Sequence, residues 1–533
     1  MIGAPRRHPA ENPVRVCLLC ICLSLPLWTP RAASGQASIL TEHNDNARTG
    51  ANLSETVLSA SNVNMQRFGM LFKRVVDDQV YSQPLYVAGV TINGAQHNVV
   101  YITTVSNSVY AFDADDAAKK DPYWHVNFGK PASITDHHFD CTDITGNFGI
   151  VGTPVIDAQS GVLYVVTLTK LDKLHFVHHL HALDITTGRD LPNSPVVIST
   201  DGFAALFQNQ RPALLLSNGV VYVGFASHCD DGRYHGFLFA FDAKSLKQLG
   251  LFNASPTGNG NSIWQSGNGP AADADGNIYV VTSNGKWDGQ ANFSESFLKL
   301  DSQLHLLDWF TPTNYRFLDK KDLDLNSSGP LLIPRTNIIL DGGKQGILYS
   351  VDATHLGHLG DENAVQHFQA TSAHLHSIVY WTSAKNGSML YLWGQMDRLR
   401  SYKFDGERFE TTPFQIRPEA TEGHPGGMLS LSANGQRDGI LWAAIQVSGD
   451  TKRESRPGVL HAYDADDLMH ELWNSLENPQ RDNCDNFSKM APPTIANGKV
   501  YLASFGTNNS GTGELCAYGL LPTEPPAASA TQR

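Results

Sequence analysis

Short strands with a regular apolar pattern recur along the chain about every sixty residues. Each copy begins with a few apolar residues, continues through a Gly or Asn-Gly turn and a strand that carries tyrosine, and ends in aromatic-Asp-Ala or a close variant. Residues 154–157, 161–166 and 180–184 form one such copy. Eight copies can be counted, and they start near Pro84, Pro154, Pro212, Pro270, Pro330, Val379, Pro425 and Pro492.

The turns within these copies predict β-hairpins. Four copies place an Asn-Gly or Asp-Gly pair between two apolar runs, where residues with positive φ fit the twist of paired strands. The pairs are Asn218-Gly219, Asp275-Gly276, Asn434-Gly435 and Asn497-Gly498. Alternating β-branched and aromatic residues, with little helical periodicity, favour an all-β chain. A period near sixty is typical of propeller blades, whereas solenoid repeats are shorter, about 20–45 residues.

A fourth, outer strand can be placed after seven of the copies but not after the last. These seven predicted strands are residues 124–128, 196–199, 249–252, 307–311, 365–370, 409–416 and 472–475. Residues 68–76 have the pattern of an outer strand with no inner strands before them, so we expect them to complete the last blade and remove the open sheet edge. The sequence therefore predicts an eight-bladed β-propeller of four-stranded antiparallel blades over residues 38–521, followed by a disordered Pro-rich tail at 522–533.

The first 37 residues have the pattern of an export signal. Arg6, Arg7 and Arg15 precede an apolar run at 16–28, and a small-residue stretch follows at 32–37. No later apolar run reaches the length of about 18 residues that a membrane span needs. We therefore expect a periplasmic or extracellular protein without a membrane span.

Charge excludes one class of partner. The chain has 39 Lys and Arg against 52 Asp and Glu, a formal net charge of −13. Binding to nucleic acid needs a positive footprint. We therefore expect no nucleic-acid partner.

Four cysteines remain once the predicted signal is removed, namely Cys141, Cys229, Cys484 and Cys516. An even number in an exported chain favours disulfides, and four cysteines allow three connectivities. Cys141 and Cys229 belong to loops of neighbouring blades, and Cys484 and Cys516 both belong to the last blade, so these are the pairs we expect. The alternative is four unpaired buried thiols.

Several motifs resemble those of the pyrroloquinoline quinone (PQQ)-like β-propeller repeat proteins, the superfamily of the quinoprotein alcohol dehydrogenases. The motifs lie at residues 44–50, 109–114, 180–188 and 322–326, and the likeness covers roughly residues 41–521. The resemblance is closest to exported members that are known only by this repeat. It implies an eight-bladed propeller, and it makes PQQ and Ca²⁺ candidate cofactors.

The chain departs from that family at the features that hold the quinone. The quinoprotein dehydrogenases carry two adjacent cysteines beside the cofactor, and this chain has no Cys-Cys pair. They also carry a tryptophan in most blades, and only Trp124 and Trp473 lie at the matching place. The fold therefore transfers more readily than the quinone chemistry.

Loops that lead into the innermost strands of a propeller converge at its central channel, so their polar residues are the candidate ligand-binding set. The set comprises Gln210, Arg211, Trp264, Gln265, Asp322, Asp324, Asn326, His424 and Lys489. Other polar residues of these loops are His137, His138, Asp140, Asp143, His376, Arg481, Asp482 and Asn483. Within the first set, Asp322, Asp324 and Asn326 alternate as oxygen ligands of a hard cation such as Ca²⁺ would. The alternative is a purely structural role, in which such residues only cap turns and strand ends.

These observations lead to two main hypotheses and a third, less favoured one. The first is a binding or scaffold protein that takes a small molecule or a protein partner at the channel mouth. The second is a PQQ- and Ca²⁺-dependent dehydrogenase with an altered site. A third hypothesis is an outer-membrane assembly scaffold like the shorter lipoprotein propellers. No hydrolase or nucleotide-binding motif is present in the sequence.

Overall fold

A computed structural model describes residues 1, 3, 36–136, 143–452, 454–506 and 511–522. The predicted signal, apart from residues 1, 3, 36 and 37, and the predicted tail, apart from residue 522, lie outside the described residues. Residues 36–522 form the propeller discussed below. None of the helices in the described ranges is long and apolar enough to cross a membrane.

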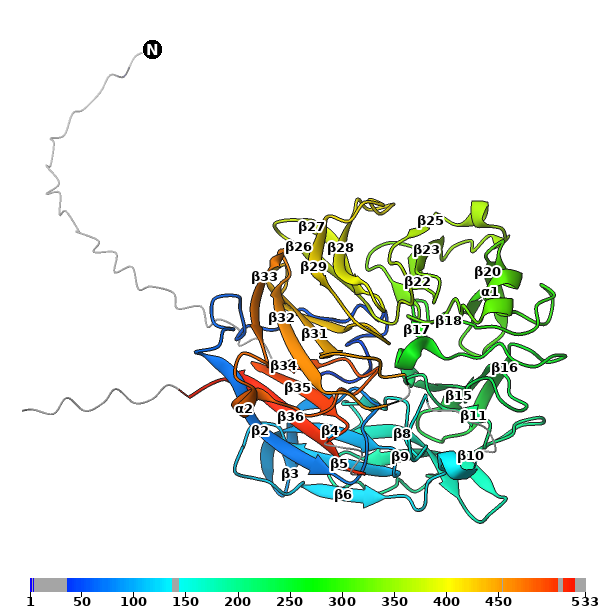
Figure 1. Ribbon diagram of the computed structural model, residues 1–533, viewed down its shortest axis with the longest axis horizontal. Coiled ribbons are helices and arrows are strands. Elements are labelled where there is room, and N and C mark those ends of the chain that lie inside the picture. The colour runs from blue at the N-terminus through cyan, green and yellow to red at the C-terminus, as the bar shows by residue number, and fades with distance from the viewer. Residues whose placement is uncertain (2, 4–35, 137–142, 453, 507–510, 523–533) are drawn as a thin grey trace, which may run out of the picture. The chain divides into compact units, whose positions relative to one another are not determined.

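Eight four-stranded antiparallel sheets are arranged as blades around a central axis, as the repeat pattern predicts (Figure 1). Blade 1 contains β3 (Leu85–Ile92), β4 (Ala95–Thr104), β5 (Ser108–Asp113) and β6 (Trp124–Asn127); blade 2 contains β7 (Val155–Asp157), β8 (Val162–Lys170), β9 (Phe176–Asp184) and β10 (Val196–Ile198); blade 3 contains β12 (Leu215–Ser217), β13 (Val220–Gly224), β15 (Phe237–Asp242) and β16 (Gln248–Asn253); blade 4 contains β17 (Ala271–Ala272), β18 (Ile278–Val281), β19 (Phe297–Leu300) and β20 (Leu306–Thr311).

The second half of the chain continues in the same way. Blade 5 contains β21 (Leu331–Leu332), β22 (Ile338–Gly342), β23 (Ile347–Asp352) and β25 (Gln366–Gln369); blade 6 contains β26 (Ile378–Ser383), β27 (Gly387–Trp393), β28 (Arg398–Phe404) and β29 (Gln415–Ala420); blade 7 contains β30 (Met428–Asn434), β31 (Arg437–Gln446), β32 (Gly458–Asp464) and β33 (Asp467–Asn474); blade 8 contains β34 (Thr494–Ala496), β35 (Lys499–Ser504), β36 (Gly513–Leu520) and β2 (Phe68–Val76). Shorter elements are β1 (Ala51–Asn52), β11 (Gln208–Asn209), β14 (Ala226–Ser227), β24 (His358–Leu359), α1 (Tyr315–Lys321), α2 (Pro479–Asp482) and the 3₁₀ turns η1 (Ile134–Asp136), η2 (Gln265–Gly267) and η3 (Asp361–Asn363).

The last blade closes the ring with a strand from the start of the chain. β2 pairs antiparallel with β36, from Phe68 opposite Leu520 to Val76 opposite Gly513. Phe68 packs edge-on against Trp473, with the two ring centroids 5.0 Å apart. The predicted closure is confirmed, and the blade that joins both ends of the chain is anchored by aromatic packing.

One disulfide also lies in this last blade. Cys516 of β36 is bonded to Cys484, as the sequence predicted. Cys141 lies outside the described residues, so its predicted bond to Cys229 stays a prediction.

One predicted outer strand is displaced. The sequence placed it at 409–416, but β29 begins at Gln415. Phe409 instead turns inward beside Phe404, with ring centroids 4.8 Å apart, and is 4% exposed. Phe409 still forms an antiparallel bridge with Phe404, and Glu410 donates its N–H to the Lys403 carbonyl oxygen, so pairing starts where it was predicted. It is interrupted near Pro413, which has no N–H to donate, and the continuous strand begins only at Gln415.

Apolar side chains on both faces of each blade pack against the neighbouring blades. β27, for example, is buried over its last five residues, and its Leu390 joins Leu340 of blade 5 and Tyr402 of blade 6 in one cluster. A sheet covered on both faces needs continuous apolar runs instead of strict alternation. The core is therefore a ring of interfaces between blades.

A segment before β2, which we call the crossing segment (residues 39–52), bonds to all eight blades in turn. Its hydrogen bonds join Ile39 to Tyr86, Leu40 to Ile156, Thr41 to Leu214, Asn46 to Ala272, Ala47 to Leu332, Thr49 to Tyr380, Gly50 to Leu431 and Asn52 to Ile495. These partners lie on the innermost strands or the residues leading into them. Because these partners follow the ring in blade order, the crossing segment winds around the central axis and ties the blades together.

Arg48 is the centre of this segment and is fully buried. Its guanidinium donates to Thr41 Oγ1 and the Glu42 carbonyl oxygen, both at 2.7 Å, and to the carbonyl oxygens of Pro270 at 3.0 Å and Leu214 at 3.2 Å. A Cβ atom at position 269 would lie 2.5 Å from Arg48 Nη2, so this position requires glycine. The contacts of Arg48 thus explain the arginine at position 48 and the glycine at position 269, which precedes blade 4.

Candidate functional site

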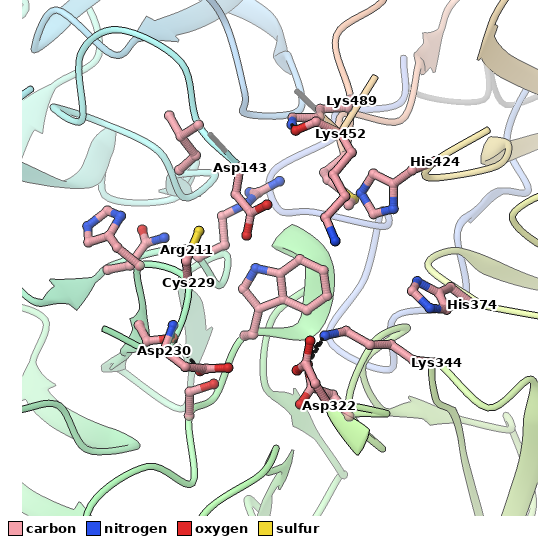
Figure 2. Close-up of a pocket in the computed structure, with 18 of the residues that line it drawn as sticks. Asp143, Arg211, Cys229, Asp230, Asp322, Lys344, His374, His424, Lys452 and Lys489 are labelled. Carbon is pink, nitrogen blue, oxygen red and sulfur yellow. Dashed lines mark hydrogen bonds and ion pairs between the residues drawn. The ribbon is translucent and has the colours of Figure 1, made fainter. Parts of the chain in front are cut away.

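A cavity of about 240 Å³ lies at the end of the axis where the chain enters the innermost strands (Figure 2). Every blade contributes at least one residue from its lead-in loop. In blade order these residues are Tyr81, Asp143, Arg211, Trp264, Asp322, His374, His424 and Lys489. In each blade, the residue that bonds to the crossing segment comes later in the chain than the lead-in residue that lines the cavity. The crossing segment therefore lies further along the axis, beyond the cavity.

A second set of loops reaches the same cavity. Asp230, Lys344, Gln395 and Lys452 line it from the connections between the second and third strands of their blades. Because successive strands of a blade run in opposite directions, these connections lie on the same face as the lead-in loops. The sequence prediction considered only the lead-in loops and so missed these four residues.

Six of the nine predicted ligand-binding residues line the cavity: Arg211, Trp264, Asp322, Asp324, His424 and Lys489. The other three are buried beside it. Gln210 donates to the Pro212 carbonyl oxygen at 2.6 Å, and Asn326 donates to those of Ser262 and Val281. The amide atoms of Gln265 have no hydrogen-bond partner among the described residues.

Of the other polar loop residues named from the sequence, some lie at the cavity and some do not. Asp143 lines the cavity, and His376 lies next to it. Arg481 instead pairs with Asp482 and donates to the Phe68 carbonyl oxygen, so these two residues brace the closing strand. His137, His138 and Asp140 lie outside the described residues.

Two buried cations line the cavity without a carboxylate within ion-pair distance among the described residues. Arg211 donates through Nη2 to the Ser266 carbonyl oxygen at 3.3 Å, and its Nη1 has no partner in this part of the chain. Lys489 donates to the carbonyl oxygens of Thr451 at 3.2 Å and Lys452 at 3.4 Å. Burial lowers the pKa of Arg211 to about 10 and that of Lys489 to about 8. Both groups are charged at neutral pH, and a buried charge is costly when it lacks a counter-ion.

The predicted calcium ligands already hold a cation of the chain's own. Lys344 Nζ lies 2.6 Å from Asp324 and 3.0 Å from Asp322, and, although burial opposes it, these carboxylates raise the lysine pKa. Asn326 directs its amide N–H groups to backbone carbonyls of the adjacent blade. Since Lys344 is ion-paired with both carboxylates and would repel a second cation, these residues do not fit a Ca²⁺ ion, which prefers six to eight oxygen ligands.

Three histidines gather at one side of the cavity. One ring nitrogen from each of His374, His376 and His424 lies within 4.8 Å of those of the other two. Burial lowers the pKa of His374 to about 4 and holds the pKa values of His376 and His424 well below the usual range, and neighbouring positive charges act in the same direction. All three imidazoles are therefore neutral at physiological pH.

Comparison with solved structures confirms the fold class. The chain is similar to a quinohemoprotein alcohol dehydrogenase from Pseudomonas putida HK5, with 15% identity, a TM-score of 0.59, and coverage of 92% of this chain and 82% of that one. It is also similar to a europium-containing methanol dehydrogenase, with 12% identity, a TM-score of 0.62, and coverage of 91% and 98%. A quinohemoprotein alcohol dehydrogenase from Comamonas testosteroni shares 14% identity at a TM-score of 0.60, with coverage of 90% and 80%.

These likenesses define the class: an eight-bladed propeller with the PQQ-like repeat fold, as the sequence motifs indicated. No family model and no curated protein matches the chain. At such low identity the likeness extends to the fold alone.

Proposed function

We propose that this protein is an exported β-propeller that binds a small organic anion in the cavity at the end of its axis. The observation that carries the proposal is the pair of buried, charged groups, Arg211 and Lys489, which line the cavity and have no carboxylate within ion-pair distance among the described residues. A bound carboxylate would supply the direct ion-pair contact that Glu42 and Asp143, which act on Arg211 and Lys489 at longer range, do not make. Guanidinium and ammonium groups are the usual partners of carboxylates in binding sites.

The rest of the lining supports an organic ligand. Lys452 adds a further cation. Of the four lining aspartates, Asp322 and Asp324 are ion-paired with Lys344, and Asp230 accepts from Ser227 and Tyr234; Asp143 is the fourth. Trp264 offers an aromatic surface within the same cavity. A volume of about 240 Å³ limits the ligand to a small molecule.

The alternative is a PQQ-dependent dehydrogenase. PQQ is itself a planar aromatic tricarboxylate, so the cations and Trp264 suit its charge and shape, and three of the similar solved structures are named as alcohol or methanol dehydrogenases. The Ca²⁺ that this chemistry requires has no fitting ligand set at Asp322, Asp324 and Asn326, for the reason given above. Anion binding without quinone catalysis is therefore the function that we favour.

Calorimetric titration of the purified protein with succinate, citrate, inorganic phosphate and PQQ tests the proposal. We expect one carboxylate site per chain, weakened at least about tenfold in Arg211→Gln and in Lys489→Met, because each variant removes a charge-assisted contact of about 1.5–3 kcal/mol. Arg189→Gln is the matched control, since Arg189 is exposed. Carboxylate binding that both cavity variants retain at full strength, or no binding of any anion, would overturn the proposal.

The same titration separates the two functions. If PQQ binds and the complex reduces a dye with an alcohol substrate in the presence of Ca²⁺, the protein is a dehydrogenase. If a carboxylate binds and no dye reduction follows, the binding function stands.

A further inference from the structure

Three histidines beside the anion cavity form a ligand set that the proposed function does not use. His374 and His376 are two residues apart in the lead-in to β26, and their rings lie beside each other. His424 comes from the lead-in to β30 of the next blade. The rings of His376 and His424 meet edge to face, with centroids 4.8 Å apart, and the His374 centroid lies 5.7 Å from His376 and 6.3 Å from His424.

Hydrogen bonds fix the tautomer of His376. Ser266 Oγ donates its proton to the Ser327 carbonyl oxygen, so it can only accept from the imidazole, and His376 Nδ1 lies 2.8 Å from it. His376 therefore carries its proton on Nδ1 and has a lone pair on Nε2. This Nε2 atom is buried and has no hydrogen-bond partner among the described residues.

His424 has the same arrangement. Its Nδ1 lies 3.2 Å from Gln395 Oε1, which is an acceptor, so His424 also carries its proton on Nδ1 and leaves Nε2 as the ligand atom. The backbone N–H of Gln395 in turn donates to the His374 carbonyl oxygen at 2.9 Å. Metal-bound histidines have this second hydrogen bond, which orients the ring.

His374 completes the set. Its Nδ1 is buried and has no partner in the described part of the chain. Unpaired ring nitrogens on neighbouring, neutral imidazoles are unusual, since buried polar atoms are normally hydrogen-bonded. A shared metal ion would satisfy both of these nitrogens, with His424 Nε2 as its third ligand.

We propose that His374, His376 and His424 form a site for a divalent transition-metal ion of the zinc class, with a remaining coordination position that faces the cavity. Imidazole nitrogen suits Zn²⁺, Co²⁺, Cu²⁺ and Ni²⁺, and three histidines with one exchangeable ligand are typical of reactive zinc sites. Zn–N bonds of about 2.0–2.1 Å place the three nitrogens about 3.3 Å apart, so small side-chain rotations close the site.

The charges that face the site decide how it is used. Lys344, Lys452 and Lys489 line the same cavity and act electrostatically on His424, and of these three only Lys344 is paired with carboxylates in the described residues. These cations oppose a bare divalent ion, whereas an anion on the remaining coordination position offsets their charge. The metal and the anion therefore bind cooperatively; this coupling rests on the proposed function, but the histidine site does not.

Titration with Co²⁺, which gives an intense visible absorption when four-coordinate, tests the site. We expect one Co²⁺ per chain, displaced by Zn²⁺, and tighter binding when succinate is present. His376→Asn and His424→Asn keep an N–H donor near the position of Nδ1 and remove Nε2, and His374→Ala removes the third ligand. Each variant is expected to weaken binding at least about 100-fold, because even second-shell changes cost 10–100-fold.

His181→Asn is the matched control. His181 is buried on β9, outside the cavity, and its Nδ1 bonds to Asp190 at 3.0 Å. The control is expected to bind Co²⁺ as wild type does. No four-coordinate Co²⁺ in folded wild-type protein, or equal binding in the control and all three variants, would sink the metal site. Succinate binding without any Co²⁺ binding would leave only the anion site, and Co²⁺ binding without succinate binding would leave only the metal site.

Discussion

Two buried arginines, at successive depths along the propeller axis, have opposite surroundings. Arg48 of the crossing segment makes four hydrogen bonds to oxygen atoms of the chain. Arg211, at the cavity, makes one at 3.3 Å, and its Nη1 has no partner among the described residues. Both guanidinium groups are buried, but only that of Arg48 has its hydrogen bonds made within the chain. We therefore assign Arg48 a structural role and Arg211 a role in binding.

The difference extends to the neighbours of each arginine. The crossing segment bonds to every blade, whereas at the cavity His374 Nδ1 and the adjacent His376 Nε2 have no hydrogen-bond partner among the described residues. A fully bonded polar network stabilises one structure, and a partly bonded one costs stability unless a ligand completes it. Substitutions at the two levels should therefore act on different quantities, stability in one case and binding in the other.

The largest expected effect is at Arg48. Arg48→Met removes the donor to four oxygen atoms and leaves them buried without that partner, so the free energy of unfolding should fall by about 3–5 kcal/mol. Urea unfolding followed by tryptophan fluorescence measures the change. The exposed control Arg189→Met should stay within about 0.5 kcal/mol of wild type. An Arg48→Met protein as stable as this control would show that the crossing segment does not hold the blades together.

Glu42 interacts electrostatically with both arginines, so the pKa of its carboxyl depends on both. Its carboxylate accepts from Thr153 Oγ1 at 2.6 Å, and burial raises its pKa to about 7 although both arginines oppose the shift. In the unfolded chain this pKa is about 4.5. The folded state therefore keeps a proton that the unfolded state has lost between these values, and the contribution of Glu42 to stability falls as pH rises from about 4.5 to 7.

Glu42→Gln removes this dependence. Relative to wild type, the variant should gain about 2 kcal/mol of unfolding free energy between pH 5 and pH 8, since one pKa unit corresponds to about 1.4 kcal/mol and the shift is partly screened. Other groups that titrate in this window, such as Asp341, are common to both proteins and cancel in the difference. Urea unfolding at the two pH values measures it, and a difference that does not change with pH would refute the role given to Glu42.

The sequence predicted the ring of blades because each blade is a local unit with its own turns and apolar strands. It also predicted closure, since residues 68–76 had no inner strands before them. It placed Arg211 and Lys489 at the channel because they lie on lead-in loops. Each of these predictions needed only the position of a residue within its own repeat.

The parts that the sequence did not predict depend on contacts between distant segments. Lys344 and Lys452 lie on loops between second and third strands, which reach the cavity only because strand direction alternates in the folded blade. His374 and His424 are 50 positions apart and meet because their blades are neighbours. The contact of Lys344 with Asp322 and Asp324, which replaces the expected cation, likewise cannot be inferred from spacing. The His374-Leu375-His376 spacing was the one local signal available for the histidine site.

The smallest expected effect on stability is at Lys489, where the comparison with Arg48 is sharpest. Burial lowers the lysine pKa to about 8, so holding its charge at pH 7 costs stability, and Met fills a similar volume without that cost. The loss of its hydrogen bonds to two carbonyl oxygens offsets part of the gain. Lys489→Met should therefore be more stable than wild type by about 1 kcal/mol at pH 7, while the exposed control Lys247→Met stays unchanged. A loss as large as that expected for Arg48→Met would mean that Lys489 is structural, and the distinction between a bonded crossing segment and a ligand-completed cavity would fail.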